Sequence, residues 1–292
     1  MKLHCRDREI DFPRRPLVMG IVNINDDSFS GDGTLDTGKA VLRAQQLLEA
    51  GADIIDVGAE SARPNRPAIA EGEEVARLRP FVERFSDLAA ECSPSDEVQL
   101  WPPLLSVNTW RFEVVKKILP LGVDILNDIG GLVESVNAEM CAETGAALIL
   151  MHTVGAPKMD HTAQNWDDVM GEMDRFFEEK IVYAKRAGLE ARRLVIDPGI
   201  EFAKQRDDNL TVYRELERLH RFGRPILLPV SRKKVIGEVL KINDPAERDA
   251  GTIACVAAGM VRGAQIFRVH NVGAAAQSVK VLDAVLGRSF TQ

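Results

Sequence analysis

Short apolar runs recur along the whole chain, and a polar side chain directly follows most of them. The runs are rich in leucine and β-branched residues, and they are far too short to cross a membrane. Continuous apolar runs of this kind are typical of parallel strands that are buried on both faces. The runs cover residues 18–22, 54–55, 104–107, 123–126, 147–151, 194–196, 226–230 and 266–267, and the polar residues after them are Asn23, Asp56, Asn108, Asn127, His152, Asp197, Ser231 and Arg268.

Eight such strands separated by helical segments predict an α/β fold of the (β/α)8 type, the TIM barrel. A length of 292 residues is typical of one barrel, so residues 1–292 are expected to form a single domain, with a short hairpin or lid over residues 1–15. In this fold the C-terminal ends of all strands surround one mouth. The polar residues after the runs are therefore expected to converge on one small polar ligand.

The composition of the chain argues against several classes of function. The net charge of −7 and the pI near 5.4 argue against general binding to nucleic acid or anionic membranes, although a local basic cluster can still bind an anionic substrate. The four cysteines lie far apart without a CxxC pair, which fits free thiols in a cytoplasmic protein better than zinc ligands or a disulfide scaffold. The N-terminus is charged from its start, so no signal peptide is expected.

Residue types also indicate the roles of several loops and the start of one helix. Residues 25–33 and 60–66 follow the first two strands, and their mixture of charge and flexibility is typical of loops that close over a substrate, with plain solvated loops as the alternative. The polar, proline-rich segment 91–103 is expected at the opposite end of the barrel. Pro245 is expected in the first turn of a helix that runs to about Val261.

Asp197 is fixed at its strand end by Pro198 and Gly199, and its carboxylate could accept two N–H bonds from an amidine-like edge of a heterocycle such as a pterin. Asn127 offers a donor and an acceptor to the same ring, and Lys233 could donate to a ring carbonyl. Taken singly, each residue is equally well explained as a polar side chain bonded to its neighbours in the barrel. Convergence of all three favours a binding site.

A second group of residues is suited to binding an anion. Arg268 and His270 are two residues apart on one strand and so face the same way, and Arg63 lies on a loop at the same end. Guanidinium groups with an imidazole suit a leaving group such as pyrophosphate. Asn23 could hold Mg²⁺ together with water and phosphate oxygens. Neither a P-loop nor a dinucleotide fingerprint is present, and no nucleophile elbow is found.

Over essentially its whole length the chain resembles the dihydropteroate synthases of folate synthesis. Each motif alone is modest, but eight in the family's order are highly specific. The matching stretches are MGIVNINDDSFS, GADIIDVGAESARP, LLSVNT, DILNDI, LILMH, LVIDPGIEFAK, VSRKKVIG and FRVHNV.

The resemblance implies that an arylamine nitrogen, that of p-aminobenzoate, displaces pyrophosphate from the methylene group of 6-hydroxymethyl-7,8-dihydropterin pyrophosphate. It also implies Mg²⁺ as cofactor and a homodimer. The expected pterin-binding residues are Asp197, Asn127, Lys233, Asn108 and Met151; the expected pyrophosphate-binding residues are Arg63, Arg268, His270 and Asn23, with Asn23 also the metal ligand; the expected p-aminobenzoate side comprises Ser61, Pro64, Phe202 and Lys234; and the residues expected to act in catalysis are Lys233, Arg268, Asn108 and Asp32.

The chain departs from the family pattern at several of these places. Asn108 stands where the family usually has an aspartate beside the pterin, and its loss removes an anion that would stabilise a cationic methylene. Glu201 and Ala203 replace glycines beside the p-aminobenzoate pocket. Lys234 replaces a serine, although a lysine could still pair with the benzoate carboxylate.

Three interpretations stay open at this point. The first is an active dihydropteroate synthase. The second is a pterin-binding homologue with lost or altered chemistry, which accepts another amine or acts as a carrier. The third is a methyltransferase domain of the related barrels that bind methyltetrahydrofolate, but a methyl donor has no pyrophosphate for Arg63, Arg268 and His270 to bind.

Overall fold

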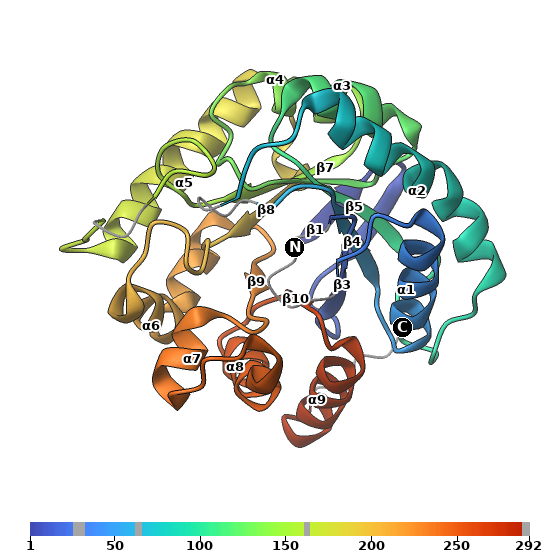
Figure 1. Ribbon diagram of the computed structural model, residues 1–292. Coiled ribbons are helices and arrows are strands. Elements are labelled where there is room, and N and C mark those ends of the chain that lie inside the picture. Colours follow the sequence, from blue (N-terminus) through green and yellow to red (C-terminus); the bar gives the residue numbers. More distant parts are fainter. Residues whose placement is uncertain (26–32, 62–65, 161–163, 288–292) are drawn as a thin grey trace.

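Eight parallel strands form a nearly closed barrel in the computed structural model of the chain, which describes residues 1–25, 33–61, 66–160 and 164–287 (Figure 1). Neighbouring strands follow the order β8-β7-β6-β5-β4-β3-β10-β9, and a single bridge between Ile196 and Ile226 joins the two ends of this series. The predicted (β/α)8 fold is confirmed. The strands are β3 (Leu17–Asn23), β4 (Ile54–Gly58), β5 (Leu104–Asn108), β6 (Ile125–Asp128), β7 (Ala147–Met151), β8 (Leu194–Asp197), β9 (Leu227–Pro229) and β10 (Ile266–Val269).

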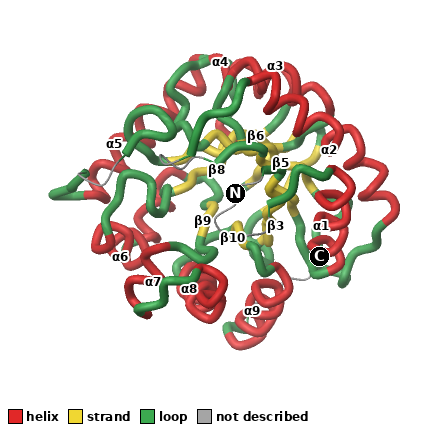
Figure 2. Tube along the Cα trace, in the orientation of Figure 1, coloured by secondary structure: helices red, strands yellow, loops and turns green. Residues whose placement is uncertain are grey.

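Helices follow the strands and cover the outside of the barrel (Figure 2). None of those in the described ranges is both long and apolar enough to span a bilayer. They are α1 (Thr37–Glu49), α2 (Glu71–Glu91), α3 (Phe112–Ile118), α4 (Val136–Thr144), α5 (Val169–Arg186), α6 (Arg206–Arg214), α7 (Lys234–Leu240), α8 (Asp249–Val261) and α9 (Val272–Val285).

The helix expected from Pro245 to about Val261 ends where predicted but does not start as one α-helix. Its first turn, Pro245–Arg248, is a 3-10 turn, and the α-helix begins at Asp249. Asp244 caps the turn by accepting the N–H of Ala246 at 2.9 Å. The fixed backbone angle of proline suits this tight start.

Strand alternation sorts the side chains into an outer core and an inner column. Residues such as Val18, Val57, Leu126 and Leu148 face outwards and pack against the helices. Their neighbours face the barrel axis, where the first layer is entirely apolar. That inner layer comprises Leu17, Met19, Ile54, Leu104, Ile125, Ala147, Ile149, Val195, Leu227 and Ile266.

The N-terminal hairpin closes the bottom of the barrel. Strands β1 (Lys2–Cys5) and β2 (Arg8–Asp11) pair antiparallel, as expected for residues 1–15. Their apolar side chains, Leu3, Cys5 and Ile10, pack under the inner apolar layer at the starts of the strands. The alternative of a lid over the substrate is therefore wrong, because the hairpin lies at the end opposite the mouth.

The segment 91–103 also lies at this bottom end, as predicted. Asp53, which directly precedes β4, is completely buried and ties the segment to the barrel. Its carboxylate accepts the N–H groups of Val18 and Leu100, each at 2.7 Å, and pairs with the Arg15 guanidinium at 3.2 Å. Burial raises the pKa of Asp53, and the positive charge of Arg15 opposes that shift.

Replacing Asp53 with alanine is expected to destabilise the protein by roughly 3–5 kcal/mol, because two N–H groups would lose their acceptor and the buried Arg15 would keep only the more distant Asp96 carboxylate, at 3.5 Å, as its counter-charge. Urea unfolding followed by circular dichroism measures this loss. Asp87→Ala, which removes an exposed carboxylate from α2, is the matched control. A loss as small as that of the control would show that Asp53 is dispensable.

Candidate active site at the mouth of the barrel

A cavity of about 690 Å³ opens at the C-terminal ends of the strands. The polar residues that were expected to converge do so here only where alternation turns them towards the axis. The expected residues that line the cavity at or after the strand ends are Asn23, Asn108, Asn127, Met151, Asp197, Lys233, Arg268 and His270.

One expected strand-end residue, His152, points away from the cavity, which corrects the expectation for it, and the neighbour of Asn127 behaves in the same way. Met151 faces the axis, so His152 faces outwards, where its ring packs against the Phe176 ring at a centroid distance of 4.9 Å. Asn127 likewise faces in and Asp128 faces out. The Asp128 carboxylate accepts the N–H of Gly130 at 2.8 Å, and burial raises its pKa to about 6.

Asp197 and Asn127 form the inner end of the cavity. Asp197 is buried, and one carboxylate oxygen accepts the N–H of Gly199 at 2.7 Å. Burial raises the pKa of Asp197 to about 6, although the Gly199 N–H and the positive charge of Lys233 oppose the shift. The buried side-chain oxygen of Asn127 has no donor among the residues that the structure describes. Such an oxygen is costly to bury unless a ligand supplies a donor.

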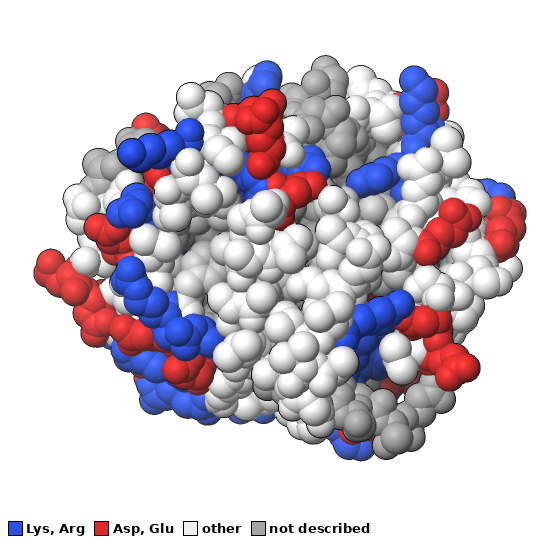
Figure 3. Space-filling model, turned by 90° about the horizontal axis from the view of Figure 1, so that it is seen from below, with Lys and Arg blue, Asp and Glu red and all other residues white. Residues whose placement is uncertain are grey.

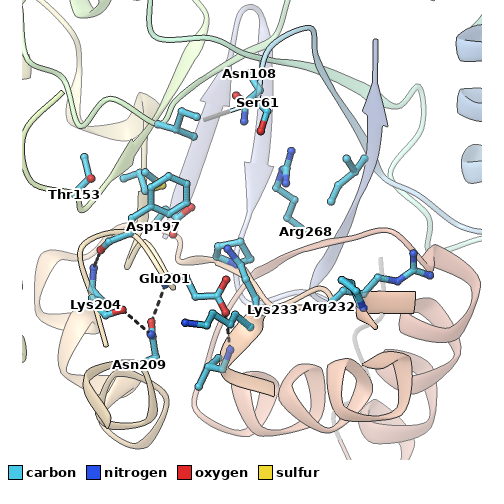
Figure 4. A pocket seen from close by; sticks show the side chains of 18 of the residues that line it. Ser61, Asn108, Thr153, Asp197, Glu201, Lys204, Asn209, Arg232, Lys233 and Arg268 are labelled. Carbon is cyan, nitrogen blue, oxygen red and sulfur yellow. Dashed lines mark hydrogen bonds between the residues drawn. The ribbon is translucent and has the colours of Figure 1, made fainter. Parts of the chain in front are cut away.

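Lys233 directly precedes α7, and its side chain points into the cavity (Figure 4). Its Nζ donates to the Ile200 carbonyl at 2.9 Å and lies 5.4 Å from the centre of the Phe202 ring. Burial lowers the pKa of Lys233, while the Glu201 and Asp197 carboxylates oppose that shift. The ammonium group is thus held between the inner end of the cavity and the Phe202 side.

Arg268 and His270 both line the cavity, as their spacing predicts. His270 Nδ1 lies 2.8 Å from the Ser231 hydroxyl, which orients the imidazole ring. Arg232 also lines the cavity, but its guanidinium pairs with Asp249 at 2.8 Å. The expected residues Asp32, Arg63 and Pro64 lie outside the residues that the structure describes.

Asp56 lies one layer of side chains below the cavity and links the Asn127 side of the cavity to the Arg268 side. The sequence alone did not suggest this role. The carboxylate is completely buried. It accepts from the Ser106 hydroxyl at 2.6 Å, from Asn127 Nδ2 at 3.2 Å and from Arg268 Nε at 2.7 Å. Strand pairing was the signal that could have found it, because Asp56 lies opposite Ser106 in the register of β4 and β5.

Lys204 is a second residue that sequence reasoning missed. Its buried Nζ lies 2.7 Å from His152 Nδ1 and donates to the carbonyls of Gly199 and Phe202 at 3.1 and 3.0 Å. Burial lowers the pKa of Lys204 to about 7. Lys204 thereby fastens the loop that carries Phe202 to the end of β7.

The remaining expected residues in the described ranges also line the cavity. Ser61 and Phe202 line it. Lys234 also lines it, but its ammonium group pairs with Glu238 at 3.2 Å and its side chain is 78% exposed, so the charge lies at the rim. Within the described ranges no three His, Cys, Asp or Glu side chains cluster as a metal site.

Comparison with known proteins decides the family. The family model "Pterin binding enzyme" matches residues 19–270. The chain is 37% identical to the dihydropteroate synthase of Escherichia coli (strain K12), over 98% of this chain and 97% of that protein. It is 35% identical to the Bacillus subtilis (strain 168) enzyme, over 98% and 94% of the two chains. This chain belongs to the dihydropteroate synthase family.

Solved structures of dihydropteroate synthases share its shape. The Yersinia pestis enzyme, in complex with a sulfonamide drug, has a TM-score of 0.87 at 35% identity and covers 98% of this chain and 99% of its own. The Xanthomonas albilineans enzyme, in complex with 7,8-dihydropteroate, has a TM-score of 0.83 at 35% identity, with 98% and 99% covered. The likeness therefore extends over the barrel and the cavity together.

Pterin affinity is expected to fall as the pH drops below about 6. The N–H donors of a pterin are expected to bind the ionised carboxylate of Asp197, and the raised pKa means that this form is lost from about pH 6 downwards. Titration calorimetry with a pterin between pH 5 and 8 should show affinity falling by roughly tenfold per unit at the acid end.

Asp197→Asn is the matched variant for this test. It should weaken pterin binding by roughly 2–5 kcal/mol and abolish the acid-side pH dependence. Near wild-type affinity in that variant would show that the pterin is held elsewhere.

Proposed function

We propose that the chain is a dihydropteroate synthase, which condenses 6-hydroxymethyl-7,8-dihydropterin pyrophosphate with p-aminobenzoate to give dihydropteroate and pyrophosphate. The observation that carries this proposal is that one cavity is lined by the Asp197 carboxylate and by Asn127, whose side-chain oxygen has no donor in the described part of the chain, together with Lys233 and Arg268. Ligands of relatives support it, because the Xanthomonas albilineans enzyme is solved with 4-aminobenzoic acid and with 7,8-dihydropteroate.

The pterin would lie at the inner end of the cavity. Its 2-amino group and ring N–H would donate to Asp197, while Asn127 would accept a further N–H through the oxygen that has no donor within the described ranges. Lys233 would donate to the ring carbonyl. Met151 lines the same end and would pack on the ring.

The pyrophosphate would lie against Arg268 and His270, with Arg63 expected to join them from its loop. Arg268 keeps its Nε on Asp56, so its terminal nitrogens are the part of the guanidinium that would reach phosphate oxygens. A Mg²⁺ ion shared with the substrate would be held at this end by the amide oxygen of Asn23, which lines the cavity, together with phosphate oxygens and the several waters that magnesium usually keeps. When bound, the ion would neutralise charge on the leaving group.

The described residues would drive the reaction mainly through charge. As the C–O bond to pyrophosphate lengthens, negative charge grows on the leaving group and is stabilised by Arg268. Positive charge grows on the pterin methylene at the same time. The arylamine is neutral and nucleophilic near pH 7, so its nitrogen can attack the methylene without prior deprotonation, and the proton leaves afterwards to water.

Incubation with dihydropterin pyrophosphate, p-aminobenzoate and Mg²⁺ tests the proposal, with dihydropteroate and pyrophosphate measured as products. Arg268→Ala should abolish turnover and weaken pyrophosphate binding far more than binding of the free pterin. If the wild-type protein binds pterin but forms no product with p-aminobenzoate or any other arylamine, the second interpretation, a pterin-binding homologue with lost chemistry, replaces this one.

Asn108→Asp is expected to raise the turnover number at least about tenfold with little change in pterin affinity, because a carboxylate there would stabilise the cationic methylene mainly in the transition state. Asn108 lines the cavity and is nearly buried, so a charge at this position would be poorly screened. Steady-state kinetics with Asn108→Ala as the uncharged control measure the effect.

The competing account is that an acid of the loop after β3, Asp26 or Asp32, supplies this charge. Both residues lie outside the described ranges. In that case Asn108→Asp would be neutral or harmful through repulsion between carboxylates, and Asp26→Asn or Asp32→Asn would slow the reaction instead. Unchanged rates in all these variants would contradict both accounts.

A homodimer is part of the proposal. The face of the molecule built by α7, α8 and α9 has a broad area without charged side chains (Figure 3). Val261 at the end of α8 and Val281 and Val285 on α9 are 58%, 62% and 72% exposed, and α8 and α9 contact each other. Sedimentation equilibrium should give twice the chain mass of 32.2 kDa, and Val281→Lys should reduce it to one chain.

A reducing compartment such as the cytosol is also part of the proposal, because the four cysteines are free thiols.

A further inference from the structure

Glu201 places a carboxylate in the wall of the cavity, on the loop between β8 and α6. Its φ of 72° lies in the left-handed region that favours glycine, so the chain keeps a charged residue at a position where the backbone conformation favours glycine. The loop holds it there because its N–H donates to Asn209 Oδ1 at 2.7 Å. Its Oε1 accepts the N–H of Val235 at 2.7 Å (Figure 4).

The location matters for the second substrate. The amine must face the pterin methylene, which in the proposed arrangement would lie between the Asp197 and Arg268 sides of the cavity. The opposite end of the arylamine then points outwards along Phe202, towards the part of the cavity lined by Glu201 and Val235. A para substituent therefore meets the Glu201 side of the wall.

Among the residues that the structure describes, the cations discussed below already have partners on this side. Lys233 donates to the Ile200 carbonyl and balances the carboxylates of Asp197 and Glu201. Lys234 pairs with Glu238 at the rim. Two arginines that line the cavity are also occupied: Arg206 pairs with Asp207 at 2.8 Å, and the Arg248 guanidinium donates to the carbonyls of Arg232, Lys233, Ile242 and Asn243.

We propose that Glu201 is a specificity-determining residue that disfavours negative charge on the arylamine. The site then accepts arylamines with an uncharged para substituent at least as well as p-aminobenzoate. The inference rests on the proposed function and specifies the class of its second substrate. Its physical basis is the repulsion between two carboxylates in a cavity that partly excludes water, where like charges interact more strongly than in bulk solvent.

Two arylamines of nearly equal size test the proposal, p-aminobenzoate with a negative charge and p-aminobenzamide without one. For the wild-type protein, kcat/KM for p-aminobenzamide should equal or exceed that for p-aminobenzoate. Glu201→Gln keeps an oxygen that can accept the Val235 N–H but removes the charge. It should raise kcat/KM for p-aminobenzoate at least about tenfold and change the value for p-aminobenzamide by less than about threefold. Glu201→Gly should act in the same direction.

Glu178→Gln is the control for a general change of net charge, since this exposed carboxylate lies on α5 and pairs with Arg221. It should leave the ratio of the two kcat/KM values unchanged. A purely structural role for Glu201 would instead change both substrates alike in Glu201→Gly and neither in Glu201→Gln. That result, or a wild-type protein that prefers p-aminobenzoate by more than about tenfold, would overturn the proposal.

Calorimetry separates this failure from failure of the proposed function. Each arylamine is titrated into the protein saturated with a pterin and pyrophosphate, which needs no turnover. If no arylamine is coupled but Glu201→Gln still strengthens p-aminobenzoate binding selectively, the charge selection holds and the catalytic proposal fails. If coupling proceeds and the variant shows no selective gain, the charge selection fails alone.

Discussion

The buried carboxylate of Asp56 is the constraint on which the mouth of the barrel depends. A carboxylate without water is costly unless several donors surround it, and Asp56 has three from three different strands: Ser106, Asn127 and Arg268. These bonds fix the amide of Asn127 and turn Arg268 to present its terminal nitrogens to the cavity. One buried charge therefore sets the distance between the proposed pterin and pyrophosphate ends.

The barrel tolerates this charge because its polar layer rests on an apolar one. The inward-facing residues below Asp56, such as Ile54, Leu104 and Ile125, are completely buried, and the N-terminal hairpin seals them from below. Water is thereby excluded from the floor of the site, which strengthens every ion pair above it. The hairpin therefore strengthens the electrostatic interactions in the site, although it lies at the opposite end of the barrel.

The strands, the hairpin and the polar strand ends could be predicted from the sequence because each depends on local periodicity. Periodicity alone could not say which residue of a pair such as Met151-His152 or Asn127-Asp128 faces the axis, since that depends on strand register. Pairs that join distant segments, such as Lys204 with His152 or Arg232 with Asp249, were out of reach for the same reason. The roles expected for Asp32, Arg63 and Pro64 stay predictions, because these residues lie outside the described ranges.

The departures from the family pattern change where negative charge lies in the cavity. Asn108 removes one carboxylate from the proposed pterin wall, and Glu201 adds one on the arylamine side, so a negative charge moves outwards, while Lys234 adds a positive charge at the rim. A cationic methylene at the inner end gains less from a charge near Phe202 than from one at residue 108, because the interaction weakens with distance. An incoming arylamine, in contrast, meets the relocated charge directly. The same exchange therefore acts against rapid cleavage of pyrophosphate and in favour of an uncharged acceptor.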